Sequence, residues 1–207
     1  MTKPSDDGDD SLHDNIAFVR SLVEEGHRAR MSGGKAFFAA GLCYGIQCLL
    51  QWAEIMGWLP WGLLGLVVSI APTAIFLIIL GAVFWKDRKA SHHGVATRAL
   101  NAAFSSAGLA NLFMVVVFGF NAAQQKSMTI WLLYPVVVCA FQGAVWFIAY
   151  MIRKKLWLAG VSAGWFATTL ALGLLIQQGQ WYVLVLGLAL LTIMGGSGYA
   201  MMVQAKK

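Results

Sequence analysis

Six stretches of the chain are almost continuously apolar, and short polar stretches separate them. A helix needs about 20 apolar residues to cross a bilayer core of about 30 Å. Each stretch approaches or exceeds that length, so the pattern predicts six membrane-spanning helices. Their expected ranges are about 36–58, 61–85, 99–120, 130–151, 157–176 and 181–203.

Composition supports the same class of protein. The chain is 59% hydrophobic and 12% charged, with a mean hydropathy of +0.68. Soluble domains are about one quarter charged. The formal charge of +6 does not indicate nucleic acid as a partner, because the basic residues form short runs between apolar stretches. The partner that the composition predicts is the lipid bilayer.

The basic residues also predict orientation. If the N-terminus is cytoplasmic, fourteen of the fifteen Lys and Arg residues fall on the cytoplasmic side, and only Lys126 falls opposite. Cytoplasmic loops of membrane proteins carry such an excess. Short loops make successive helices antiparallel neighbours. We therefore expect an all-α antiparallel bundle of six transmembrane helices with both termini in the cytoplasm.

A polar head of residues 1–34 precedes the membrane domain, residues 35–207. Residues 1–10 are rich in Asp and are predicted to be disordered. Residues 11–31 repeat apolar side chains at helical spacing, which predicts a short amphipathic helix. This helix either lies on the anionic inner leaflet or docks its apolar stripe on a cytoplasmic protein partner.

The run DNIAFVRSLVEEGHRARMSGGKAFFAAGLCYGI, residues 14–46, joins this head to the first span. It resembles the start of a group of small bacterial inner-membrane proteins of uncharacterised function, which have a comparable polar head, a Gly-Gly break and then a first span. The resemblance implies a bacterial inner-membrane location. It implies no activity and no functional residues.

Two GxxxG motifs predict sites of close helix packing. They are Gly41 with Gly45 in the first span and Gly160 with Gly164 in the fifth. Small residues allow helix backbones to approach closely in a membrane. The motifs suit contacts within one chain and equally suit a homodimer.

Polar side chains within the spans are the candidate binding residues. In the first span they recur at helical spacing and share one face, and a second polar stripe lies in the third span. We expect both stripes to face the interior, because amides facing lipid have no partners. The candidates are Tyr44, Gln47, Gln51 and Glu54, then Asn101, Ser105 and Asn111, and finally Gln142 in the fourth span.

Glu54 has two interpretations. Ionisable residues inside a membrane are functional candidates by default, which makes Glu54 a proton or cation site. Alternatively, Glu54 is close enough to Trp58 at the outer interface to reach water or headgroups, or to pair with Lys126.

No catalytic, metal-binding or cofactor-binding residue is predicted. The chain has no HExxH or GxSxG motif, no phosphate-binding glycine loop and no CxxC pair. All four histidines fall in predicted cytoplasmic segments. The sequence therefore favours a non-enzymatic protein of regulatory, sensory or scaffolding type. A small transporter or channel that uses the Glu54 stripe is the alternative, and a membrane enzyme is the third.

Overall fold

The computed structural model describes residues 32–59, 63–87 and 95–206. Several predictions fall outside these residues: the disordered 1–10 segment, the 11–31 amphipathic helix and the cytoplasmic segments that contain the four histidines.

The described chain is 92% helical and contains no strand. Each helix overlaps one of the six apolar stretches. The first helix is Ser32–Ile55, and it is followed by α2 (Leu63–Asp87), α3 (Val95–Gln125), α4 (Met128–Arg153) and α5 (Leu156–Leu174). The last helix has three parts: α6 (Gly179–Ala189), the π-helical turn η1 (Leu190–Gly195) and α7 (Gly196–Lys206). The predicted all-helical architecture with six helices is confirmed for the described residues.

Five of these helices are long and apolar enough to cross a membrane, so the chain is a multi-pass membrane protein. The exception is α2, whose apolar stretch is shorter, Val67–Val83. Large apolar side chains cover the outer surface, including Leu112, Phe113 and Phe120 of α3. A surface this apolar suits lipid better than water.

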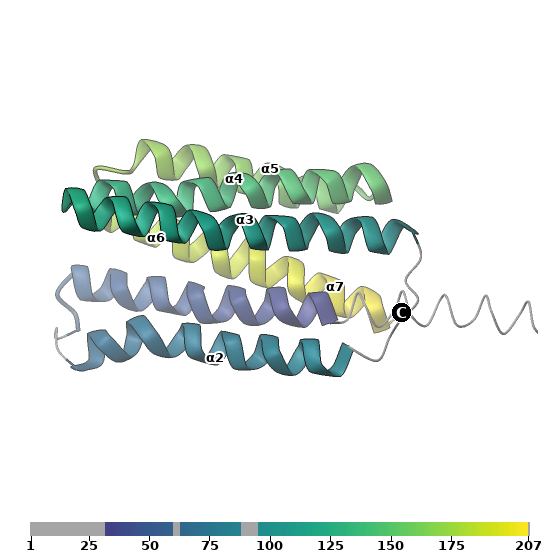
Figure 1. The fold of residues 1–207 in the computed structure, drawn as a ribbon, viewed down its shortest axis with the longest axis horizontal. Helices are drawn as coiled ribbons and strands as arrows, with labels where there is room; N and C mark the ends of the chain where they lie inside the picture. The colour runs from purple at the N-terminus through teal and green to yellow at the C-terminus, as the bar shows by residue number, and fades with distance from the viewer. Residues whose placement is uncertain (1–31, 60–62, 88–94, 207) are drawn as a thin grey trace, which may run out of the picture.

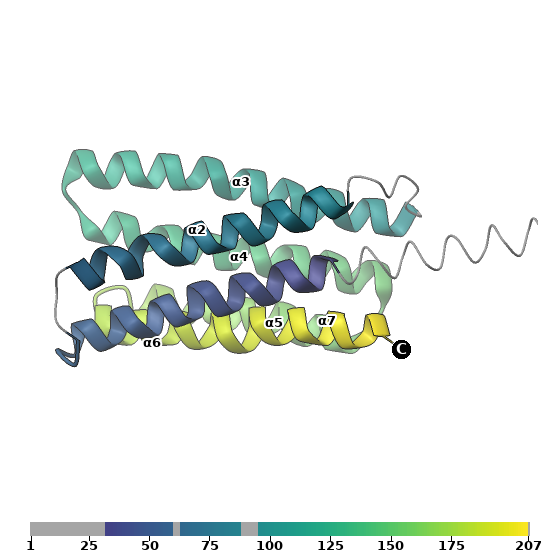
Figure 2. The same ribbon diagram turned by 90° about the horizontal axis from the view of Figure 1, so that it is seen from below.

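The helices run side by side along one long axis (Figures 1 and 2). The start of the first helix and the end of α7 lie at the same end of the bundle, which we call the terminal end. The membrane side that this end faces stays a prediction from the distribution of basic residues.

The first helix and the last helix meet backbone to backbone along a line of glycines, which we call the glycine seam. A Cβ atom added at Gly41 would lie 2.7 Å from the Cα of Gly195, and one added at Gly198 would lie 2.7 Å from the carbonyl oxygen of Gly34. No real Cβ fits at such distances, so these positions must be glycine. The motif of Gly41 and Gly45 therefore packs within the chain, against η1 and the end of α6.

The second GxxxG motif behaves differently. Gly164 faces Ile193 of η1, where an added Cβ would lie 3.1 Å from the side chain. Gly160 has nothing within 4 Å of such a Cβ among the described residues. In the second motif, therefore, only Gly164 is in close contact with another helix.

A hydrogen bond joins α4 to α5 in the core. Ser162 donates its hydroxyl to the carbonyl oxygen of Gly143 over 2.8 Å, and both residues are buried. The ring of Phe166 covers Gly143 so closely that an added Cβ would lie 2.9 Å from it. Together with buried Trp146 and Trp165, these contacts fix α4 against α5.

Candidate ligand-binding cavity

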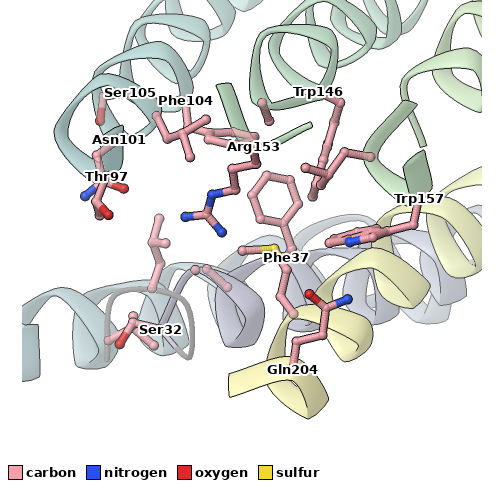
Figure 3. A pocket seen from close by; sticks show the side chains of 18 residues that line it. Ser32, Phe37, Thr97, Asn101, Phe104, Ser105, Trp146, Arg153, Trp157 and Gln204 are labelled. Carbon is pink, nitrogen blue, oxygen red and sulfur yellow. The ribbon is translucent and has the colours of Figure 1, made fainter. Parts of the chain in front are cut away.

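A cavity of about 310 Å³ opens at the terminal end of the bundle. The first helix, α2, α3, α4, α5 and α7 all contribute side chains to its walls, as Figure 3 shows at close range. This volume is at the lower end of the range for small-molecule sites, about 300–1,000 Å³. We call it the terminal cavity.

One wall of the terminal cavity is a cluster of aromatic rings from four helices. Phe37 and Phe104 meet edge to face at 5.2 Å between ring centroids, and each meets Trp146 at 5.4 Å. Trp157 lies 6.0 Å from Trp146. Edge-to-face pairs of this kind are favourable and directional, so the wall is rigid.

Polar groups converge on the other side. Arg153 extends from the end of α4 across the cavity, with its guanidinium pointing toward Thr97 and Asn101 of α3 in Figure 3. Ser105 lies one turn beyond Asn101 on the same helix, and Gln204 of α7 lies beside the Trp157 ring. The cavity thus combines a cation, amides and hydroxyls with an aromatic wall.

Two hydrogen-bond donors in the aromatic wall have no partner. The indole nitrogens of Trp146 and Trp157 are buried, and neither finds an acceptor among the described residues. Trp146 as a whole is 1% exposed. Leaving a buried N–H donor unpaired costs about 1–3 kcal/mol. Trp165, which is not part of the cavity wall, has an unpaired indole nitrogen as well, and none of the three nitrogens has appreciable accessible surface.

The predicted stripe of the first helix lies elsewhere, against α2. Gln47 donates to the carbonyl oxygen of Ser69 over 3.3 Å, and the Tyr44 ring lies 5.4 Å from that of Phe76. Gln51 is half-buried on the same helix. The shared face was predicted from the spacing, but in the structure it covers α2 and stays apart from the terminal cavity.

Glu54 is enclosed by protein. Its side chain is 5% exposed, and an added Cβ on Gly65 of α2 would lie 3.4 Å from Glu54 Oε1. Lys126 is exposed in the turn between α3 and α4 and forms no ion pair with Glu54 in the described part of the chain. The interpretation of Glu54 as a side chain reaching water or Lys126 does not fit this packing.

The remaining predicted residues divide between two places. Asn101 and Ser105 line the terminal cavity. Asn111 lies deeper, beside Tyr134, and its Oδ1 has no hydrogen-bond partner in the described residues. The same holds for Oε1 of half-buried Gln142. The structure brings only Asn101 and Ser105 together as one site.

Arg153, Trp146 and Trp157 were not predicted as site residues. Arg153 was counted only among the basic residues that predict orientation. One pattern pointed to the pair on α4: Trp146 and Arg153 are seven residues apart, which places them on the same helix face.

No family model, curated protein or solved structure matches this chain. Its function is therefore argued from the geometry. The described residues also contain no group of three His, Cys, Asp or Glu side chains able to hold a metal ion.

Proposed function

We propose that this protein is a non-enzymatic sensory or regulatory protein of a bacterial inner membrane, with both termini in the cytoplasm. In this proposal the terminal cavity is the sensing site and the polar head, residues 1–34, is the output. The observation that carries the proposal is the position of the cavity at the point where the head enters the membrane domain.

The connection is direct. Ser32, Gly33, Ala36 and Phe37, in the first two turns of the first helix, are part of the cavity wall. A ligand in the cavity would contact the helix that continues into the head, so binding can change the population of head conformations. The distribution of basic residues supports a cytoplasmic position for this end.

A cavity-filling substitution tests the proposal without knowledge of the ligand. Ser105→Phe places a ring in the cavity, whereas Ser106→Phe is the matched control, because Ser106 is exposed on the same helix and is not part of the wall. Hydrogen exchange of residues 11–31 is measured by mass spectrometry in lipid nanodiscs. We expect Ser105→Phe to change exchange in this segment several-fold and Ser106→Phe to leave it unchanged. Identical exchange in both variants and the wild type would contradict a sensory role.

A second candidate, a small transporter or channel, is favoured by one observation: the buried carboxylate of Glu54 between the first helix and α2. Intramembrane carboxylates often mark ion or proton pathways. Proton and monovalent-cation flux in proteoliposomes tests this function. Flux that Glu54→Gln abolishes and Lys126→Gln retains would support transport. Background flux in the wild type would exclude it for these ions.

A further inference from the structure

We propose that the terminal cavity binds the headgroup of an anionic phospholipid from the leaflet at that end of the bundle. Arg153, which extends across the cavity in Figure 3, would hold its phosphate oxygens. This inference deepens the proposed sensory function and rests on it for the role of the cavity, because it names the class of molecule that is sensed.

Charge selects an anion. Arg153 contributes a permanent positive charge to the cavity, and none of the described lining residues is a carboxylate. Lys35, Arg98, Lys154 and Lys155 are also exposed at the same end of the bundle. An aromatic wall alone also suits a quaternary ammonium group. A guanidinium in the same cavity opposes that choice.

The guanidinium selects an acceptor. It only donates, so a complementary ligand must present acceptor oxygens. A phosphate does so, and its geometry matches the planar fork of arginine. Arg153 already takes part in an interaction within the protein. Its five N–H donors allow it to serve a phosphate in addition.

The apolar walls select an amphiphile. Leu80 and Val83 of α2, Leu100 of α3 and Met201 of α7 line the cavity beside the polar groups. Leu77 and Ile78, one turn earlier on α2, are exposed on the outer surface of the bundle. A headgroup in the cavity can therefore extend its acyl chains along an apolar surface into the bilayer. The volume of about 310 Å³ holds only the polar part of such a lipid.

Lipid binding to the purified full-length chain is the test, measured by native mass spectrometry in a neutral detergent. Phosphatidylglycerol and phosphatidylcholine with identical acyl chains are added at equal concentration. We expect the wild type to bind phosphatidylglycerol about tenfold more tightly, because both lipids carry the phosphate but the quaternary ammonium of phosphatidylcholine is repelled by Arg153. Arg153→Gln should abolish the preference. Arg98→Gln, which removes the same charge from an exposed side chain outside the cavity, should retain it.

A second variant keeps the test valid if Arg153→Gln does not fold. Ser105→Phe fills the cavity without removing a charge and should weaken phosphatidylglycerol binding several-fold, whereas Ser106→Phe should leave it unchanged. Equal binding of the two lipids by the wild type, or preference for phosphatidylcholine, would overturn the inference. Loss of the preference in Arg98→Gln would show a surface charge effect and overturn it too.

Two further measurements distinguish failure of the lipid assignment from failure of the sensory function. Displacement of the lipid by glycerol phosphate at similar concentration would identify a soluble phosphate compound as the ligand and overturn the lipid assignment. If phosphatidylglycerol binds as expected but exchange in residues 11–31 ignores Ser105→Phe, the sensory function fails and the lipid site stands. If that exchange responds but no lipid preference exists, only the lipid assignment fails.

Discussion

The two faces of the first helix pack in opposite ways. On one face Gly34, Gly41 and Gly45 press against the last helix with no space for a methyl group. On the other face Ala36 and Phe37 border a cavity of about 310 Å³. The difference shows that a membrane helix can be held rigidly along one side while its other side remains open to a ligand. A rigid seam is also what allows a cavity beside it to persist.

The largest effect is expected from a single methyl group in the glycine seam. Gly41→Ala places a Cβ 2.7 Å from Gly195 Cα and 2.8 Å from the Leu190 carbonyl oxygen, both backbone atoms that cannot rotate away. We expect a loss of about 2–3 kcal/mol of stability, seen as a lower Tm in detergent.

Gly160→Ala is the control for that experiment. Nothing in the described structure lies within 4 Å of its added Cβ. Alanine is the better helix former, so the Tm should stay the same or rise. An equal decrease in Tm for Gly41→Ala and Gly160→Ala would contradict the difference between the tightly packed glycine seam and the open surface at Gly160.

An intermediate effect is expected where α5 meets α4. Ser162→Ala removes the hydroxyl that bonds to the Gly143 carbonyl in the buried interface. We expect a loss of about 1 kcal/mol, measured as a lower Tm. Thr192→Ala is matched, because its hydroxyl bonds the Leu188 carbonyl of its own helix and is exposed. A larger loss of stability in Thr192→Ala would contradict the expectation that a hydrogen bond between helices contributes more stability than one within a helix.

The smallest effect on stability is expected at the cavity wall. Asn101→Ala removes an exposed amide that contributes to the wall without supporting the helix packing. The Tm should change by no more than the equivalent of about 0.5 kcal/mol. A large decrease would mean that the cavity end is as constrained as the glycine seam, and the comparison of the two faces would fail.

Hydropathy was sufficient to predict six helices, but only five of them have the apolar length that bilayer thickness requires, and α2 does not. Spacing was likewise sufficient to group Tyr44 with Gln47 on one helix face. It could not show that this face covers Phe76 and Ser69 of α2, because pairing between helices depends on contacts distant in sequence.

The terminal cavity was beyond prediction for the same reason. Arg153 follows α4's last apolar turn and was assigned to orientation, since any basic residue at a helix end satisfies that pattern. Its place beside Phe37 and Trp157 depends on the relative tilt of the first helix, α4 and α5. Only the same-face spacing of Trp146 and Arg153 was visible in advance.

The π-helical turn at Leu190–Gly195 has a consequence for how this protein tolerates insertions and deletions. A π turn holds one residue more than the α turn it replaces, so the two halves of the last helix have separate registers. Deleting a single residue within it would restore a continuous α-helix and leave α7 facing the same way, with Gly198 still against Phe38. The same deletion within α7, before Gly198, would instead rotate the residues beyond it by about 100° and bring a side chain against Phe38. The π turn is therefore the place where the last helix can lose one residue and still fit against the first.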